Sequence, residues 1–142
     1  MNDNATTPTP PQEAFRLMQS ELPIIPRTRA GYNFKYAPYE KIGELAFPII
    51  WKHGFSICHC VTRDSGVPVV RTIITHTESG ATWSSDYEFD PKVRDQERGK
   101  SLTYGKRYNT VLLLGLMIEG EPDRDDDDGS ARASENSHDN EF

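Results

Sequence analysis

The sequence has no long hydrophobic run and little cysteine. No stretch approaches the roughly 18 apolar residues that a membrane-spanning helix needs. Residues 1–12 are polar and Pro/Thr-rich, without the basic start and apolar stretch of a secretory signal. The two cysteines, Cys58 and Cys60, stand two positions apart and indicate reduced cytosolic thiols. We therefore expect a cytoplasmic protein, and neither a membrane protein nor a disulfide-stabilised secreted domain.

Apolar residues are also scarce, at 35% of the 142 positions, and the charge is unevenly distributed. Residues 119–142 hold ten of the 22 acids and two of the 16 bases, so they carry a net charge of -8 and leave +2 for residues 1–118. Charge blocks of this kind are typical of solvated, disordered segments. We predict one core domain over residues 13–118, preceded by a disordered N-terminus (1–12) and followed by an acidic disordered tail (119–142).

Helical spacing of apolar residues predicts three helices. A short one covers Ala14–Leu22, and a second covers Pro38–Gly54 with a kink at Pro48. After a polar loop at Asp90–Gly99, a long helix covers Ser101–Ile118. Beyond Val111 this last helix is apolar on all sides, so its second half should be buried.

Between the last two helices the hydrophobic period changes from helical spacing to two. Strands are predicted from Phe55 to Val61, from Val67 to Thr77 and from Ala81 to Phe89, separated by short turns. Short turns between alternating strands favour an antiparallel meander with one face covered by helices. The fold class is therefore α+β, a three-stranded antiparallel β-meander packed by a long helix, in the order α–β–β–β–α.

No pattern for metal or nucleotide chemistry is strong. Cys58 and Cys60 would face one side of a strand and His59 the other, without the second ligand pair that structural zinc needs, so buried small side chains are the simpler interpretation. The acidic run Asp125–Asp128 lies in the predicted tail, where carboxylates do not form a rigid cation site. Gly99–Ser101 lacks the earlier glycine of a P-loop and is interpreted as a helix start. We predict neither a cofactor nor an enzyme.

Basic residues gather around the start of the long helix. The group comprises Arg94, Arg98, Lys100, Lys106 and Arg107. Thr103 and Thr110 share the polar, basic face of that helix with Lys106 and Arg107. Such a face is either ordinary solvated surface or a track for a nucleic-acid backbone. Aromatic residues could add stacking on unpaired bases, and the candidates are Tyr32, Phe34, Tyr36 and Trp83, although core positions suit them equally.

Two stretches together resemble a known family. The first holds FKYA at Phe34–Ala37 and KHG at Lys52–Gly54. The second begins with a helix that carries Gly99, Thr103, Tyr104, Arg107 and Tyr108, continues through an apolar run and ends in DDDDG at Asp125–Gly129. In order and spacing these are similar to the ERF-type (essential recombination function) single-strand annealing proteins of phages and prophages. The similarity extends over roughly residues 14–130.

The resemblance implies a RAD52-like core that assembles into homo-oligomeric rings or filaments in a bacterial host cell. It implies ATP-independent binding of single-stranded DNA and annealing of complementary strands in homologous recombination. Partners would be single-stranded DNA, the annealed duplex, further copies of the chain, and host or phage recombination proteins. DNA contacts are then expected first at Lys106 and Arg107, next at Lys100 and Arg98, and further at Arg94, Thr103 and Thr110, with base stacking at Tyr32, Phe34 and Tyr36.

Three alternatives stay open. A single-stranded DNA-binding protein could protect strands without annealing them, and a small nuclease could use the acidic run with a divalent metal. A structural protein could also carry a basic face that binds nothing. Annealing, metal-dependent cleavage and salt-sensitive DNA binding discriminate among them.

Overall fold

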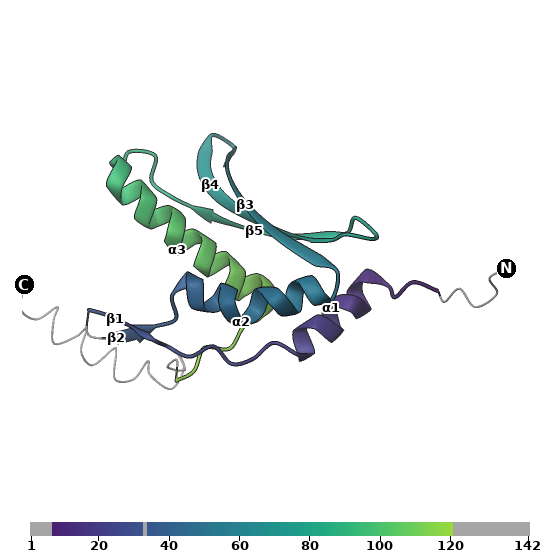
Figure 1. The fold of residues 1–142 in the computed structure, drawn as a ribbon. Coiled ribbons are helices and arrows are strands. Elements are labelled where there is room, and N and C mark those ends of the chain that lie inside the picture. The colour runs from purple at the N-terminus through teal and green to yellow at the C-terminus, as the bar shows by residue number, and fades with distance from the viewer. Residues whose placement is uncertain (1–6, 33, 121–142) are drawn as a thin grey trace, which may run out of the picture.

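A computed structural model describes residues 7–32 and 34–120 (Figure 1). Within these residues the chain forms three helices and two antiparallel sheets. In chain order the elements are α1 (Pro11–Ser20), β1 (Arg29–Gly31), β2 (Phe34–Tyr36), α2 (Tyr39–Lys52), β3 (Phe55–Asp64), β4 (Val67–His76), β5 (Thr82–Glu88) and α3 (Asp95–Leu114). The α+β class is therefore confirmed.

The three-stranded sheet is the predicted meander. Its order is β3–β4–β5, with Ile57 opposite Ile74 and Ile74 opposite Trp83 across the three strands. Gly66 and Gly80 have φ values of 84° and 80°, a region that favours glycine, and they allow the two tight turns. The helices lie on one side of this sheet and leave its other side open (Figure 1). The prediction of one covered and one solvent-facing side is thus confirmed.

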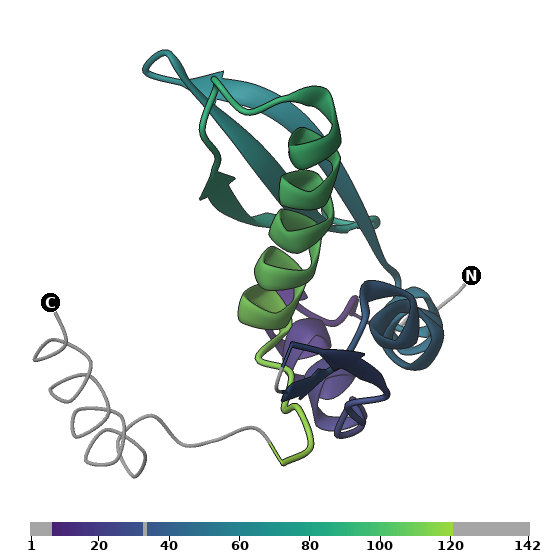
Figure 2. The ribbon, with the colours of Figure 1, turned by 90° about the vertical axis from the view of Figure 1, so that its left-hand side faces the viewer.

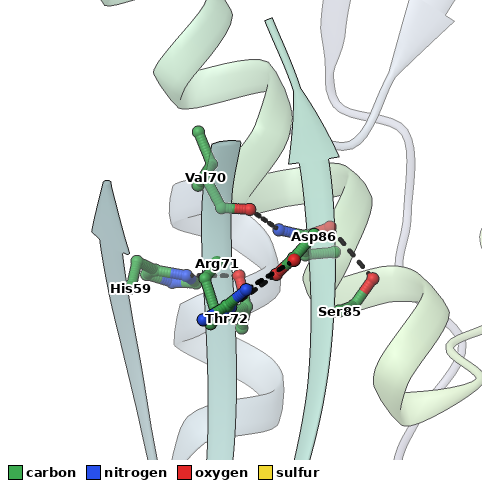
Figure 3. Close-up of polar contacts among 7 residues, drawn as sticks. His59, Val70, Arg71, Thr72, Ser85 and Asp86 are labelled. Carbon is green, nitrogen blue, oxygen red and sulfur yellow. Dashed lines mark hydrogen bonds and ion pairs between the residues drawn. The ribbon is translucent and has the colours of Figure 1, made fainter. Parts of the chain in front are cut away.

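The open side of the sheet carries polar side chains in cross-strand pairs. Arg71 on β4 donates two hydrogen bonds of 2.8 Å to the carboxylate of Asp86 on β5, as Figure 3 shows. This contact lowers the pKa of the Asp86 carboxyl. Cys58 and Cys60 lie on the same side and are exposed, so the prediction that they are buried is wrong. No described helix covers this side, and small side chains alternating toward it remain in contact with solvent.

The covered side of the sheet packs closely on α3. Gly105 is buried so near the sheet that a Cβ there would lie 3.0 Å from both the Tyr87 ring and a Val70 methyl group. One turn further on, Asn109 is fully buried. Its Nδ2 donates a 2.9 Å bond to the Val70 carbonyl, and its Oδ1 accepts a 3.1 Å bond from the Ser85 hydroxyl. Small and polar residues therefore fix the position of α3 on the sheet.

The main hydrophobic core lies where α1, α2 and the C-terminal end of α3 meet the sheet. Fully buried members are Met18, Ile25, Ile42, Ala46, Ile50, Ile74 and Leu114. An aromatic cluster of Phe15, Phe55 and Trp83 joins α1 to the sheet, with ring centroids 4.7–5.8 Å apart. Trp83, a candidate for base stacking from the sequence, thus belongs to this core.

The predicted helices exist, but two have different bounds. α1 begins at Pro11, inside the segment predicted to be disordered, because proline suits the first turn of a helix. α3 begins at Asp95, so the expected loop at Asp90–Gly99 is half helical, with Asp95 and Glu97 favouring the helix N-terminus. It ends at Leu114 rather than Ile118, because Gly115 takes a left-handed conformation with φ 63°. α2 is continuous through Pro48.

The structure also differs from the prediction in the burial of the end of α3 and in the elements before α2. The second half of α3 and the residues after it are not fully buried: Leu112 is 57% and Met117 69% exposed, because the core covers only one side of this segment. Residues 29–36 form the β1–β2 hairpin, which the predicted order of elements does not contain, with Arg29 opposite Tyr36. The order is therefore α–β–β–α–β–β–β–α rather than α–β–β–β–α. Glu119 and Gly120 are described, whereas the rest of the predicted acidic tail lies outside the described residues.

Candidate nucleic-acid interface

A groove lies between the β1–β2 hairpin and the side of α3 that faces away from the sheet. In Figures 1 and 2 the sheet and the hairpin lie on opposite sides of α3. The groove consists of two adjoining cavities of about 660 and 790 Å³. Four side chains line both cavities, and these are Phe34, Tyr36, Tyr104 and Arg107. We call the two cavities together the hairpin–α3 groove.

The hairpin–α3 groove is rich in positive charge. Five basic side chains line it, and these are Arg27, Arg29, Lys35, Lys100 and Arg107. Among the described residues that line it, Glu40 is the one carboxylate, and it accepts a 2.9 Å bond from Arg29. Four positive charges are thus in excess, on a surface open to solvent. Such a surface attracts the phosphates of a polyanion without reading its sequence.

Aromatic rings form the second component of the groove. Tyr104 and Tyr108 lie one turn apart on α3, with ring centroids 6.1 Å apart and planes 22° from parallel. Tyr87 of β5 packs against both from behind, at 5.4 and 5.5 Å. Both α3 tyrosines are nevertheless 45% exposed, because their other sides face the groove. They form a supported apolar surface, which we call the tyrosine platform.

Arg107 connects the hairpin to α3. Its guanidinium lies 5.0 Å from the ring centroid of Tyr36 on β2 and 5.0 Å from that of Tyr104 on α3. Guanidinium groups prefer such positions over aromatic faces. The two rings leave the edges of the guanidinium available for hydrogen bonds, so Arg107 is held in place without being neutralised by a carboxylate in the described residues.

Lys106 points to a different part of the molecule from Arg107. Its Nζ lies 4.9 Å above the ring of Tyr39 on α2. Tyr39 lines one of the two cavities, but Lys106 itself lines neither. The Tyr39 hydroxyl lies 2.6 Å from His59 Nε2, and Thr72 Oγ1 lies 2.7 Å from His59 Nδ1. Figure 3 shows the His59–Thr72 contact between β3 and β4. Successive positions on a helix are about 100° apart, which separates these two predicted contacts.

The His59 imidazole is neutral at physiological pH. Burial and, to a smaller extent, the positive charge of Lys106 together lower its pKa to about 4. Burial raises the pKa of the Tyr39 hydroxyl. A neutral imidazole donates one bond and accepts one, and the two hydroxyls can supply either partner. This polar cluster therefore joins α2, α3 and the sheet through side-chain contacts.

The other predicted contacts are divided between the groove and elsewhere. Lys100 and Thr103 line the groove. Arg98 lies on the sheet side, 5.8 Å from the Phe89 ring centroid, and Arg94 is exposed just before α3. Thr110 is fully buried and its hydroxyl donates a 2.7 Å bond to the Lys106 carbonyl. The structure thus contradicts Thr110 as a surface contact, because the polar face of α3 turns toward the core there.

The predicted stacking residues are also divided. Phe34 and Tyr36 line the groove, with their ring centroids 6.0 Å apart. Tyr32 is 87% exposed in the turn of the hairpin and lines neither cavity. The structure brings Lys100, Thr103 and Arg107 together with these two aromatic residues.

Sequence reasoning missed six basic or aromatic residues that line the groove. They are Arg27, Arg29, Lys35, Tyr39, Tyr104 and Tyr108. Two signals were available: residues 27–36 are dense in basic and aromatic side chains, and Tyr104, Tyr108 and Leu112 repeat every four positions on α3. An apolar stripe on a helix normally indicates core, and the short hairpin has too weak a pattern to show that it faces this stripe.

The described residues contain neither a metal-ligand cluster nor a P-loop at the helix start. Residues 7–32 and 34–120 contain no group of three or more His, Cys, Asp or Glu side chains placed to hold a metal ion. Asp125–Asp128 and Gly129 lie outside these residues. Gly99–Ser101 lies in the second turn of α3, so the interpretation of these residues as a helix start is wrong.

No helix in the described residues has the length and apolar character needed to cross a membrane.

Comparisons with known proteins identify a family. Neither the curated proteins nor the solved structures contain a match to the chain. The family model of the ERF superfamily, in contrast, matches residues 12–141, which include all three helices except Pro11, both sheets and the acidic residues after Gly120. The resemblance seen in the sequence is therefore confirmed, and the chain belongs to the ERF superfamily of single-strand annealing proteins.

Proposed function

We propose that the hairpin–α3 groove binds single-stranded DNA and that the protein anneals complementary strands without ATP. Membership of the ERF superfamily supports a role in recombination by single-strand annealing. The observation that carries the assignment to this groove is the combination of five basic side chains with a half-exposed tyrosine platform. Phosphates and unpaired bases are the two groups that such a surface complements.

The basic side chains would hold the sugar–phosphate backbone. Lys100 and Arg107 approach the groove from α3, whereas Arg27, Arg29 and Lys35 approach it from the hairpin side. A strand lying between them would exchange condensed counterions for these cations, which favours binding at low salt. The contacts go to phosphates and would therefore be independent of sequence, as annealing of arbitrary strands requires.

The tyrosine platform would distinguish single strands from duplexes. The faces of unpaired bases are accessible, whereas those in a duplex are covered by their neighbours. The ring centroids of Tyr104 and Tyr108 are 6.1 Å apart. That distance exceeds the roughly 3.4 Å rise of a strand in B-form DNA. Rings at this spacing suit a stretched strand whose bases are separated, and such a strand can meet its complement base by base.

Annealing would need several copies of the chain. One groove offers only five basic side chains, too few for tight binding of a long strand at physiological salt. The outer edges of β3 and β5 pair with no other strand in the described residues, and pairing of such edges between copies is one route to a ring or a filament. Adjacent copies would raise the local concentration of bound segments. The annealed duplex, and host or phage recombination proteins, would be further partners.

The mechanism involves no bond making, so we propose a non-enzymatic protein in which pairing itself provides the driving force. The groove would hold one strand by its phosphates and present it in an extended form. A second strand would then pair by Watson–Crick hydrogen bonds, and release of the duplex would follow because paired bases no longer stack on the platform.

The test is annealing of two complementary fluorescent oligonucleotides without ATP or metal, with light scattering on the same sample to give the oligomeric state. We expect faster annealing by an oligomer. The variant Lys100→Ala/Arg107→Ala should lose at least about tenfold in affinity for single strands, since two phosphate contacts disappear. The matched control is Arg16→Ala/Lys52→Ala, which removes the same charge from α1 and α2 away from the groove.

Each alternative has its own outcome. Binding without faster annealing would leave a protective single-strand-binding protein. Magnesium-dependent cleavage that depends on Asp125–Asp128 would favour a nuclease. Equal affinities of the two double variants would show that the groove is not the DNA site.

A further inference from the structure

The described residues end at Gly120, beside the wall of the hairpin–α3 groove. Ile25 accepts a 2.8 Å bond from the Glu119 amide and donates a 2.9 Å bond to the Met117 carbonyl, so residues 117–119 are fixed beside it. Ile118 itself lines the groove. Gly120 lies against Arg27, since a Cβ there would be 3.0 Å from Arg27 Nη2. Whatever follows Gly120 therefore starts next to a basic side chain of the groove.

The residues that follow have the opposite charge to the groove. Residues 121–142 contain nine acids and two arginines, a net charge of -7. The run Asp125–Asp128 begins five residues after Gly120. Five residues span at most about 16–18 Å when extended. Only this short length of chain thus separates four consecutive carboxylates from a groove that has four positive charges in excess.

We propose that residues 121–142 of the same chain, which we call the acidic segment, occupy the hairpin–α3 groove and compete there with single-stranded DNA. The proposal rests on the proposed function for its second half, since the groove must be the DNA site for the competition to matter. Tethering gives such a segment an effective concentration in the millimolar range, so weak contacts suffice for occupancy. Proximity of the anchor at Ile118–Gly120 is the reason for choosing this chain's own segment over that of another copy.

The two occupants would share the basic side chains of the groove, and only DNA would also use the tyrosine platform. Carboxylates can pair with Arg27, Lys35, Lys100 and Arg107, as phosphates do. They carry no bases, so the tyrosine platform gains nothing from them. A DNA strand uses both the charges and the platform, and it can therefore displace the acidic segment. A duplex offers phosphates without accessible base faces, so the acidic segment would exclude duplexes more strongly than single strands.

The first experiment maps the segment's position without any DNA. Carbodiimide joins carboxylates to lysine amines that are in contact, and peptide mass mapping of the full chain identifies the pairs. We expect Asp125–Asp128 to join to the groove lysines Lys35 and Lys100. Lys92 is the matched control, because it is exposed and lines neither cavity. A mixture of isotope-labelled and unlabelled chains distinguishes joining within one chain from joining between copies.

The second experiment measures affinity. The full chain with Asp126→Asn, Asp127→Asn and Asp128→Asn should bind a twelve-nucleotide oligo(dT) about three- to tenfold more tightly at ~50 mM salt, and equally at ~500 mM, where the Debye length is only a few ångströms. The charge-matched control is Asp64→Asn/Glu78→Gln/Glu88→Gln. All three of these positions are exposed and lie on the strands of the sheet or in its turns. It should change affinity less than twofold.

The outcomes separate this inference from the proposed function. Joining spread equally over Lys35, Lys92 and Lys100, or equal effects of the two triple variants, would overturn the inference while leaving DNA binding intact. Joining mainly between copies would overturn the choice of the chain's own segment. Selective joining to the groove in a protein that does not bind oligo(dT) would overturn the proposed function and leave the groove occupied by the acidic segment alone.

Discussion

The two sides of α3 differ in the contacts that their side chains make. The side toward the sheet carries Gly105 and Asn109, which are buried and make close or hydrogen-bonded contacts. The side toward the hairpin carries Tyr104, Arg107 and Tyr108, which pack on other rings and still face solvent. On the first side, the packing and the hydrogen bonds of these residues are completed within the chain. On the second side, ring surface and one guanidinium charge remain available to a ligand. One helix thus separates the residues that stabilise the fold from those available to a ligand.

The largest effect on this comparison is expected from Asn109→Ala. The change leaves the Val70 carbonyl and the Ser85 hydroxyl without their partner and opens a cavity under α3. We expect a loss of about 2–4 kcal/mol in the free energy of unfolding. Urea unfolding at pH 7 measures it, with Tyr108→Ala as the control on the open side of the helix. A loss as large for Tyr108→Ala would mean that the two sides of α3 do not differ in this way.

The next largest effect concerns the tyrosine platform. Tyr104→Leu/Tyr108→Leu keeps helix propensity and apolar contact with Tyr87 but removes both rings from the groove. Affinity for oligo(dT) should fall at least about 30-fold, since each of the two stacked bases is worth about 1–3 kcal/mol. The dependence of log K on log salt should keep its slope, because no charge changes. A flatter slope with unchanged affinity at low salt would contradict base stacking here.

Arg107 and Lys106 give a third comparison, between adjacent positions that the sequence ranks together. Arg107→Ala should weaken single-strand binding about 5- to 20-fold and reduce the salt slope by about 0.7, the value for one phosphate contact in a single strand. Lys106→Ala should change affinity about twofold or less, because Lys106 packs over Tyr39 at the margin of the groove and lines neither cavity. Equilibrium binding across a salt series measures both. Equal losses would place the strand on the Lys106 side as well.

These two residues illustrate what the sequence can and cannot predict. Period-two and helical patterns correctly predict the meander, α2 and the existence of α3, because each buries a regular apolar set. The β1–β2 hairpin was missed because three-residue strands carry almost no pattern. Basic and aromatic composition pointed to Arg107, Phe34 and Tyr36. It did not separate Arg107 from Lys106, because that difference depends on which neighbours α2 and the hairpin place beside them.

A smaller effect is expected from His59, behind Lys106. Its pKa is lowered from 6.5 to about 4, so the unfolded chain binds more protons than the folded protein between these values. The stability that neutral His59 contributes is therefore complete above pH 6.5 and declines as the pH falls toward 4. After allowance for its half-buried position we expect about 1–2 kcal/mol. Urea unfolding from pH 7.5 to 4.5, compared with His59→Gln, isolates this contribution, and parallel curves would contradict it.

The smallest effect is expected at Glu40, the carboxylate among the described residues that line the groove. Glu40→Gln removes a solvent-exposed ion pair with Arg29, so the free energy of unfolding should change by less than about 0.5 kcal/mol. Arg29 then has its full charge available to a phosphate, and affinity for oligo(dT) should rise about twofold at low salt, where screening is weak. Glu44→Gln is the control, since Glu44 pairs with Lys41 on α2 and does not line the groove. If both variants raise affinity equally, the gain comes from net charge, and Arg29 makes no contact of its own with the strand.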